Sequence, residues 1–99
     1  NDQAHAELIV DIPQGSYIAG TNPEAGMSEF QITFSGAGTW KADVLNKQKF
    51  TESFNVPITG IPPNEQEGNV RIQISYQECN ENMCLQPESR ELELVWYRR

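Results

Sequence analysis

Cysteine and histidine are scarce in this chain, which has two cysteines and one histidine among its 99 residues. Basic side chains are also few, because 7 lysines and arginines stand against 14 aspartates and glutamates, for a formal net charge of −7. Nucleic acid and anionic membrane surfaces repel such a chain, so we expect neither as a partner. No apolar stretch approaches the roughly 20 residues of a membrane helix, so we expect no direct membrane contact.

The length allows one domain with a modest core. Apolar residues make up 37% of the chain, and its aromatic and β-branched residues are spread from end to end, unlike those of a disordered protein. We therefore predict a single, monomeric domain over residues 1–99. The chain opens on Asn1 without a methionine and no signal peptide is visible, so we expect a fragment of a longer protein that is itself a candidate for membrane attachment.

Alternation of apolar and polar side chains predicts most of the secondary structure. It is clearest over Asn69–Tyr76, where every second residue from Val70 is apolar or aromatic. The same alternation predicts strands at Glu29–Phe34 and at Glu91–Trp96, where Leu92, Leu94 and Trp96 share a face, and weaker alternation predicts one at Phe50–Ile58. Short candidate strands lie at Leu8–Ile12, Ser16–Ala19 and Thr39–Val44. Pro57 predicts that its strand is an edge strand or carries a bulge. About seven short strands separated by glycine and proline turns predict an all-β, immunoglobulin-like β-sandwich.

Cys79 and Cys84 have four residues between them, a spacing that leaves three interpretations. As a structural staple, so small a loop contributes only about 2 kcal/mol in the chain-entropy model, against ~4 or more for a long-range bridge. As a redox pair, the same spacing holds two sulfurs together for exchange. A zinc site is the weakest interpretation, because structural zinc takes four ligands and the single histidine, His5, lies in a terminal segment. We expect no metal and no cofactor.

Carboxylates surround the cysteines in sequence. Glu78 and Glu81 flank Cys79, and no lysine or arginine occurs between Tyr76 and Ser89. Nearby negative charge disfavours a thiolate, so we expect a raised thiol pKa and slow reaction with arbitrary disulfides. Reaction would then depend on a partner that docks and changes the local environment.

Two short runs around the cysteines carry a family resemblance: Tyr76-Gln77-Glu78-Cys79 and Met83-Cys84-Leu85-Gln86-Pro87. This pattern resembles the N-terminal periplasmic domain of the thiol:disulfide interchange protein DsbD. Gly15–Ile18 is similar to an early strand of that family, and Trp40–Pro57 to its tryptophan-containing segment. The resemblance extends over about Gly15–Val95.

The resemblance implies an immunoglobulin-like domain with its cysteine pair on a hairpin. It implies thiol–disulfide exchange that relays reducing equivalents between thioredoxin-like proteins and oxidised periplasmic or other extracytoplasmic bacterial proteins, as in cytochrome c biogenesis. In the family the second cysteine forms the mixed disulfide, so Cys84 would be the attacking sulfur and Cys79 the resolving one.

Relatives shield the pair with a cap loop, for which Trp40–Asn46 is the matching stretch. Within it, the resemblance assigns the acidic position to Asp43 and the cap to Val44 or Leu45. The stretch is shorter than in the family and lacks an aromatic cap, so we expect either weaker shielding or shielding from Met83 or Tyr17 instead.

Several of these side chains have a simpler explanation than a role at the site, namely packing in the core or exposure to solvent. A tyrosine such as Tyr17 is more often a core or rim residue than a site residue, and Asp43 has the character of a solvated carboxylate. Tyr76 is expected to begin one arm of the hairpin. The alternative function for the whole chain is a non-catalytic immunoglobulin-like binding or spacer module with an inert local disulfide.

Overall fold

Nine β-strands, and no helix, run through residues 3–98, the part of the chain that the computed structural model describes. The strands are β1 (Ala4–Val10), β2 (Ser16–Ala19), β3 (Gln31–Ser35), β4 (Thr39–Ala42), β5 (Lys49–Phe50), β6 (Phe54–Ile61), β7 (Glu67–Tyr76), β8 (Glu78–Asn80) and β9 (Glu88–Tyr97). Residues 1, 2 and 99 of the predicted domain lie outside the described residues. Within 3–98, no segment forms a helix of the length and apolar character that crossing a membrane requires.

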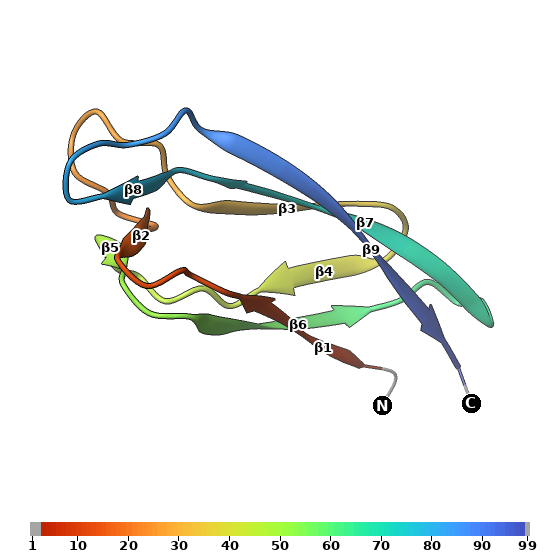
Figure 1. Cartoon of the computed structure of the whole chain (residues 1–99). Helices are drawn as coiled ribbons and strands as arrows, with labels where there is room; N and C mark the ends of the chain where they lie inside the picture. The colour runs from red at the N-terminus through yellow and green to blue at the C-terminus, as the bar shows by residue number, and fades with distance from the viewer. Residues whose placement is uncertain (1–2, 99) are drawn as a thin grey trace.

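Three small antiparallel sheets build the molecule, in the strand orders β1-β6-β4, β3-β7-β9 and β5-β2-β8. The first two form the layers of a sandwich, and the third lies at the end farthest from the two chain termini (Figure 1). The domain is elongated, with extents of 49 × 20 × 19 Å. The prediction of an all-β sandwich with the cysteines on a hairpin is confirmed.

Several strand bounds differ from the sequence-based ones: β1 starts before Leu8 and ends before Ile12, and β4 ends at Ala42 instead of Val44. Ser16–Ala19 is β2 without change, and Asn69–Tyr76 lies within β7. The strand expected over Phe50–Ile58 is instead two, because residues 51–53 leave the ladder between β5 of the end sheet and β6 of the sandwich. Alternation cannot reveal this break, because side chains from both segments reach the same core.

Pro57 corrects a second expectation. It lies in β6, which is the central strand of its sheet, and its register against Glu7 of β1 is continuous, without a bulge. The carbonyl oxygen of Pro57 accepts from the backbone N–H of Asp43 at 2.9 Å, just past the end of β4. Proline has no backbone N–H to donate. At Pro57 the missing N–H lies opposite the end of β4, so no hydrogen bond between the paired residues of β4 and β6 is lost.

A buried cluster joins the three sheets, and its members are Ile18, Phe30, Phe50, Ile58, Ile72 and Ile74. Phe50 and Phe54 stack with ring centroids 4.0 Å apart, although they belong to different sheets. Such aromatic pairs contribute about 0.5–1.5 kcal/mol beyond the area that they bury. Because Ile18 comes from β2, the core holds the end sheet that carries the first cysteine.

Leu92 departs from the predicted pattern. Its alternation with Leu94 and Trp96 predicts burial of all three, but Leu92 is 45% exposed while Trp96 is 7% exposed. β9 is an edge strand, and Leu92 borders an open cavity between the two layers. The alternation identified the correct face of the strand, but that face is incompletely covered.

Candidate functional site

Cys79 and Cys84 form a disulfide across a short hairpin. They lie opposite each other in an antiparallel bridge with Cα atoms 3.9 Å apart. Backbone hydrogen bonds close the hairpin on both sides of the pair, from Asn80 N–H to the Met83 carbonyl at 2.8 Å and from Leu85 N–H to the Glu78 carbonyl at 2.9 Å. The cysteines thus occupy a non-hydrogen-bonded position, where opposite side chains approach most closely.

The side chain of Asn80 shapes the tip of this hairpin. Its Oδ1 accepts from the backbone N–H groups of Asn82 at 2.8 Å and Met83 at 2.9 Å. Asparagine commonly satisfies turn donors in this way. The turn is therefore held by hydrogen bonds that do not depend on the bond between the two sulfurs.

Gln77 holds the base of the hairpin. Its Nε2 donates to the carbonyl of Leu85 at 3.1 Å, and its Oε1 accepts from the backbone N–H of Ser28 at 2.8 Å. Its own carbonyl accepts from Ala19 N–H of β2 at 3.0 Å. Gln77 belongs to the cysteine motif, but the sequence alone assigned it no role. Its position two residues before Cys79 was the one indication that it could contact the hairpin.

The two sulfurs differ in their access to solvent. Cys79 lies on β8 beside β2 and is 2% exposed. Cys84 lies on the outer arm of the hairpin and is exposed. Its neighbours Met83 and Leu85 are 58% and 50% exposed, large values for apolar side chains. A partner can therefore reach the disulfide from the Cys84 side.

Tyr17 lies directly opposite Cys79 in the β2–β8 ladder. Opposite residues of an antiparallel pair share one face of the sheet, so the tyrosine covers the neighbourhood of the buried cysteine. The ammonium of Lys49, from β5, lies 4.8 Å from the centre of the Tyr17 ring. The fold thus brings a cation to a region where the local sequence has only carboxylates, and sequence reasoning missed Lys49 because it is 30 residues from Cys79.

The predicted cap residues lie in the segment between β4 and β5. Asp43 is exposed, Val44 packs against the core, and Leu45 is 64% exposed. The Leu45 carbonyl accepts from the hydroxyl of Thr21 at 3.0 Å, beyond the end of β2. β5 pairs with one edge of β2, whereas the cysteine hairpin pairs with the other. The structure thus places Tyr17 opposite Cys79 and Met83 next to Cys84, whereas Asp43 is hydrogen-bonded to Pro57 of β6 and Leu45 to Thr21.

Tyr76 ends β7, one residue before Gln77. Its hydroxyl donates to Glu88 Oε2 at 2.8 Å and accepts from Arg90 Nε at 3.0 Å. Partial burial raises the pKa of Tyr76 above its ordinary value of 10.0, and the hydrogen bond to the Glu88 carboxylate raises it further. The side chain keeps its proton and links the two long strands β7 and β9 near the hairpin.

Among residues 3–98, no three histidine, cysteine, aspartate or glutamate side chains are grouped so that they could hold a metal ion. The disulfide is typical of proteins outside the cytoplasm, where thiols are not kept reduced. Comparisons with family models, with curated proteins and with solved structures found no match for this chain.

Proposed function

We propose that this chain is a thiol–disulfide exchange domain of the bacterial periplasm. It would relay reducing equivalents from a thioredoxin-like donor to oxidised extracytoplasmic proteins, in the manner that its likeness to the DsbD N-terminal domain implies. The observation that supports this best is the unequal access to the two sulfurs, since Cys84 is exposed while Cys79 is 2% exposed. In thiol–disulfide exchange an attacking thiolate approaches one sulfur of the disulfide along the S–S bond. Of the two sulfurs, only that of Cys84 is accessible to such an approach.

Reduction of the domain begins at Cys84. A partner thiolate attacks Cys84 Sγ, a partner–Cys84 disulfide forms, and the Cys79–Cys84 bond breaks with Cys79 leaving as the thiolate, which takes up a proton. A second thiolate of the partner then attacks the partner sulfur that is bonded to Cys84. The partner's own disulfide forms, and Cys84 is released as a thiolate that takes up a proton. Two electrons pass from the partner dithiol to the domain, and the partner leaves with a disulfide.

Delivery of the electrons reverses these roles. The Cys84 thiolate attacks the disulfide of an oxidised protein, and one sulfur of that protein leaves as a thiolate. Cys79, held beside it on the hairpin, attacks Cys84 and releases the second sulfur of the client. The client gains two electrons and two protons, and the domain returns to its disulfide form.

A relay must change oxidation state without unfolding, and the hairpin is suited to this. Asn80 and Gln77 hold the tip and the base through hydrogen bonds that involve neither sulfur. The β2–β8 ladder, with Tyr17 opposite Cys79, anchors the buried arm. Breaking the S–S bond therefore removes one constraint among several.

Single cysteine variants test the proposal. Cys79→Ser leaves the exposed Cys84 free, and we expect it to accumulate a mixed disulfide with a thioredoxin-like protein. Cys84→Ser leaves only the buried Cys79, and we expect far less adduct. Non-reducing electrophoresis and mass spectrometry of the adduct measure both. If neither variant traps any thioredoxin-like protein, the relay function is wrong.

The reduction potential separates a relay from an inert staple. Structural disulfides generally have potentials below about −300 mV, whereas exchange-active ones lie in the range of thioredoxin, about −270 mV, or higher. We expect the folded domain to equilibrate with a thioredoxin-like couple. A potential far below that range would favour the alternative of a binding or spacer module.

A further inference from the structure

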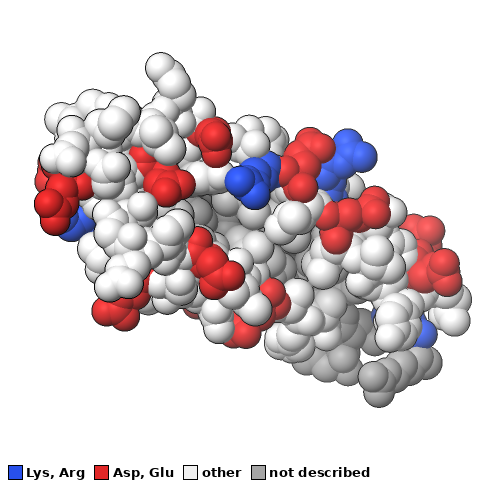
Figure 2. All heavy atoms as spheres, viewed as in Figure 1, with Lys and Arg blue, Asp and Glu red and all other residues white. Residues whose placement is uncertain are grey.

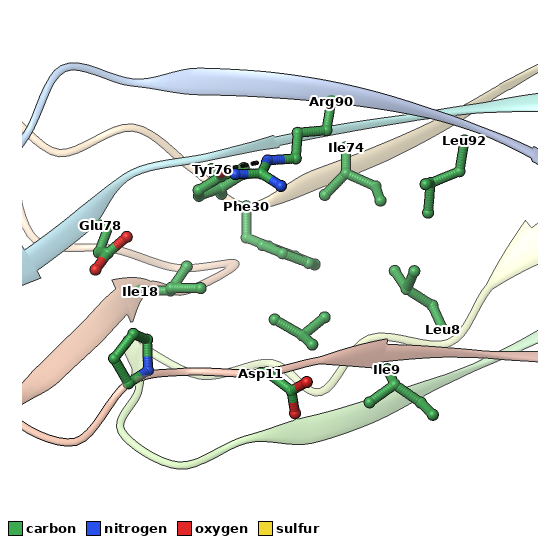
Figure 3. Close-up of a pocket in the computed structure, with 12 residues that line it drawn as sticks. Leu8, Ile9, Asp11, Ile18, Phe30, Ile74, Tyr76, Glu78, Arg90 and Leu92 are labelled. Atoms are coloured by element: carbon green, nitrogen blue, oxygen red, sulfur yellow. Dashed lines mark hydrogen bonds between the residues drawn. The ribbon is translucent and has the colours of Figure 1, made fainter.

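An open cavity of about 420 Å³ lies between the two layers of the sandwich. Apolar side chains from both layers line most of it, among them Leu8 of β1, Ile74 of β7 and Leu92 of β9. Figure 3 shows Leu8 and Leu92 pointing into the same space from opposite sides. The volume falls within the range of ligand-binding sites, and the surface is hollowed near the centre of the view in Figure 2.

The lining residues reveal how β1 borders this cavity. Leu8, Ile9, Val10 and Asp11 all line it in succession, whereas β9 contributes only Arg90 and Leu92. Alternate residues of a strand point to opposite faces. Arg90 and Leu92 are two positions apart, so β9 turns one of its two faces toward the cavity. Leu8, Ile9 and Val10 of β1, and Asp11 just after it, border the cavity without alternation, so β1 presents its backbone edge to the cavity.

That edge of β1 is unpaired, because among residues 3–98 the strand is hydrogen-bonded only to β6 on its other side. Alternate backbone N–H and C=O groups therefore point from β1 toward the cavity. Exposed edges are usually protected by lysine, proline or a bulge. Ala4–Val10 contains neither residue, carries Glu7 as its one carboxylate, and has a continuous seven-residue register against β6.

The charge around the cavity selects the kind of strand that would fit. Asp11 and Glu78 lie among the lining residues, with Arg90 as the basic member. Arg90 donates to Tyr76, which donates to Glu88, so its charge is partly offset by a third carboxylate. A second copy of this chain is a poor occupant, because each carries a formal net charge of −7.

We propose that this cavity binds an extended segment of a partner protein in which apolar and basic side chains alternate. The segment adds as a strand to the free edge of β1, which is a recurring mode of peptide recognition. Its apolar side chains enter the cavity against Leu8 and Leu92. Its basic side chains point to the opposite face, where β1 carries Glu7 and where Asp11 follows the end of the strand. Neither cysteine lines the cavity, although Glu78, which does, adjoins Cys79.

Titration of the whole domain with a capped seven-residue peptide of alternating lysine and valine tests this proposal. Controls are the same peptide with glutamate in place of lysine, and one of the same composition with the three valines in a block. We expect binding of the alternating basic peptide alone. Hydrogen exchange followed by NMR should show new protection at alternate amides of Ala4–Val10, the signature of strand addition.

Two variants of β9 provide a matched pair. Leu92→Lys places a cation in the cavity, and we expect at least about a tenfold loss of affinity for the basic peptide. Val95→Lys makes the same change at a 64% exposed position of β9 that does not line the cavity. We expect its affinity to stay within about twofold of the unmodified chain.

Four outcomes would overturn the proposal: no binding up to about 1 mM peptide, equal binding of either control peptide, equal losses in the two variants, or self-association that Leu92→Lys abolishes. The last would identify a second copy as the occupant. A domain with both cysteines changed to serine should still bind the peptide. Failure of the redox proposal and failure of this one are therefore distinguishable.

Discussion

The side-chain amide of Gln77 donates to the carbonyl oxygen of Leu85 at 3.1 Å and ties together the two arms of the cysteine hairpin. The same side chain accepts from the backbone of Ser28, in the loop that follows β2. Gln77 therefore positions the exposed arm, which carries Cys84, against a distant segment. This restraint is present whether or not the two sulfurs are bonded.

Replacing Gln77 with glutamate separates its two bonds. Gln77→Glu keeps an oxygen that accepts from Ser28 but lacks a donor for the Leu85 carbonyl. We expect the free energy of unfolding of the oxidised domain to fall by about 1–3 kcal/mol. The reduction potential should rise, because a looser Cys84 arm lowers the effective concentration of the thiols. Denaturant titration and redox equilibration measure these two effects.

Gln66→Glu makes the same charge change in an exposed loop and serves as the control. It should leave both the unfolding free energy and the potential nearly unchanged. A potential that shifts equally in the two variants would mean that added charge, and not the lost bond to Leu85, is responsible.

Asn80 offers a second test of the hairpin. Asn80→Ala removes the oxygen that accepts from the N–H groups of Asn82 and Met83, so the unfolding free energy should fall by about 1–2 kcal/mol. Asn82→Ala, in the same turn, retains that oxygen and should cost less. Thermal unfolding of the oxidised forms compares them, and equal losses would contradict the assigned role of the Asn80 side chain.

Exposure predicts the order in which the reduced cysteines react. Cys84 should be alkylated at least about tenfold faster than Cys79, because the latter is buried against β2. Both should react more slowly at neutral pH than an unstructured thiol, since Glu78 and Glu81 disfavour the thiolate. Timed alkylation with peptide mass spectrometry measures each rate. Rapid alkylation of either cysteine at neutral pH would contradict the expectation of a guarded pair.

Tyr76 predicts a loss of stability at alkaline pH. Its pKa is raised in the folded protein by burial and by the Glu88 carboxylate, so above pH 10.0 the unfolded chain ionises first while the folded chain keeps its proton. The folded state then binds more protons, and the unfolding free energy declines as pH rises. The contribution is complete below the unfolded pKa and is lost as the pH passes the folded value.

Tyr76→Phe should flatten this part of the pH profile, although it also removes the bonds to Glu88 and Arg90 and lowers stability at neutral pH. Tyr97→Phe, which changes a tyrosine that is 70% exposed, should keep the alkaline slope of the unmodified chain. Unfolding free energies measured from pH 8 to pH 11 compare the three proteins across the reference tyrosine pKa of about 10. A slope unchanged in Tyr76→Phe would contradict the role of this hydroxyl.

Several elements could be predicted from neighbours along the chain. Ser16–Ala19 and the long run ending at Tyr76 were predictable because a strand with one covered face alternates with period two. Pro57 was misassigned, because its missing donor is harmless where β4 ends, and the end of a neighbouring strand is not written in the local sequence. The break between β5 and β6 was missed for a similar reason, since Phe50 and Phe54 stack across two sheets.

The closeness of Cys79 and Cys84 followed from their spacing, because so short a loop allows its ends to meet at little entropic cost. Which of the two sulfurs is accessible did not follow from it. Cys79 is covered because β2, more than 50 positions earlier in the chain, pairs with β8, whereas no strand of residues 3–98 pairs with the outer side of the arm that carries Cys84. Burial depends on segments that the chain brings from far away, so which of the two sulfurs is accessible is set by packing and not by the local motif.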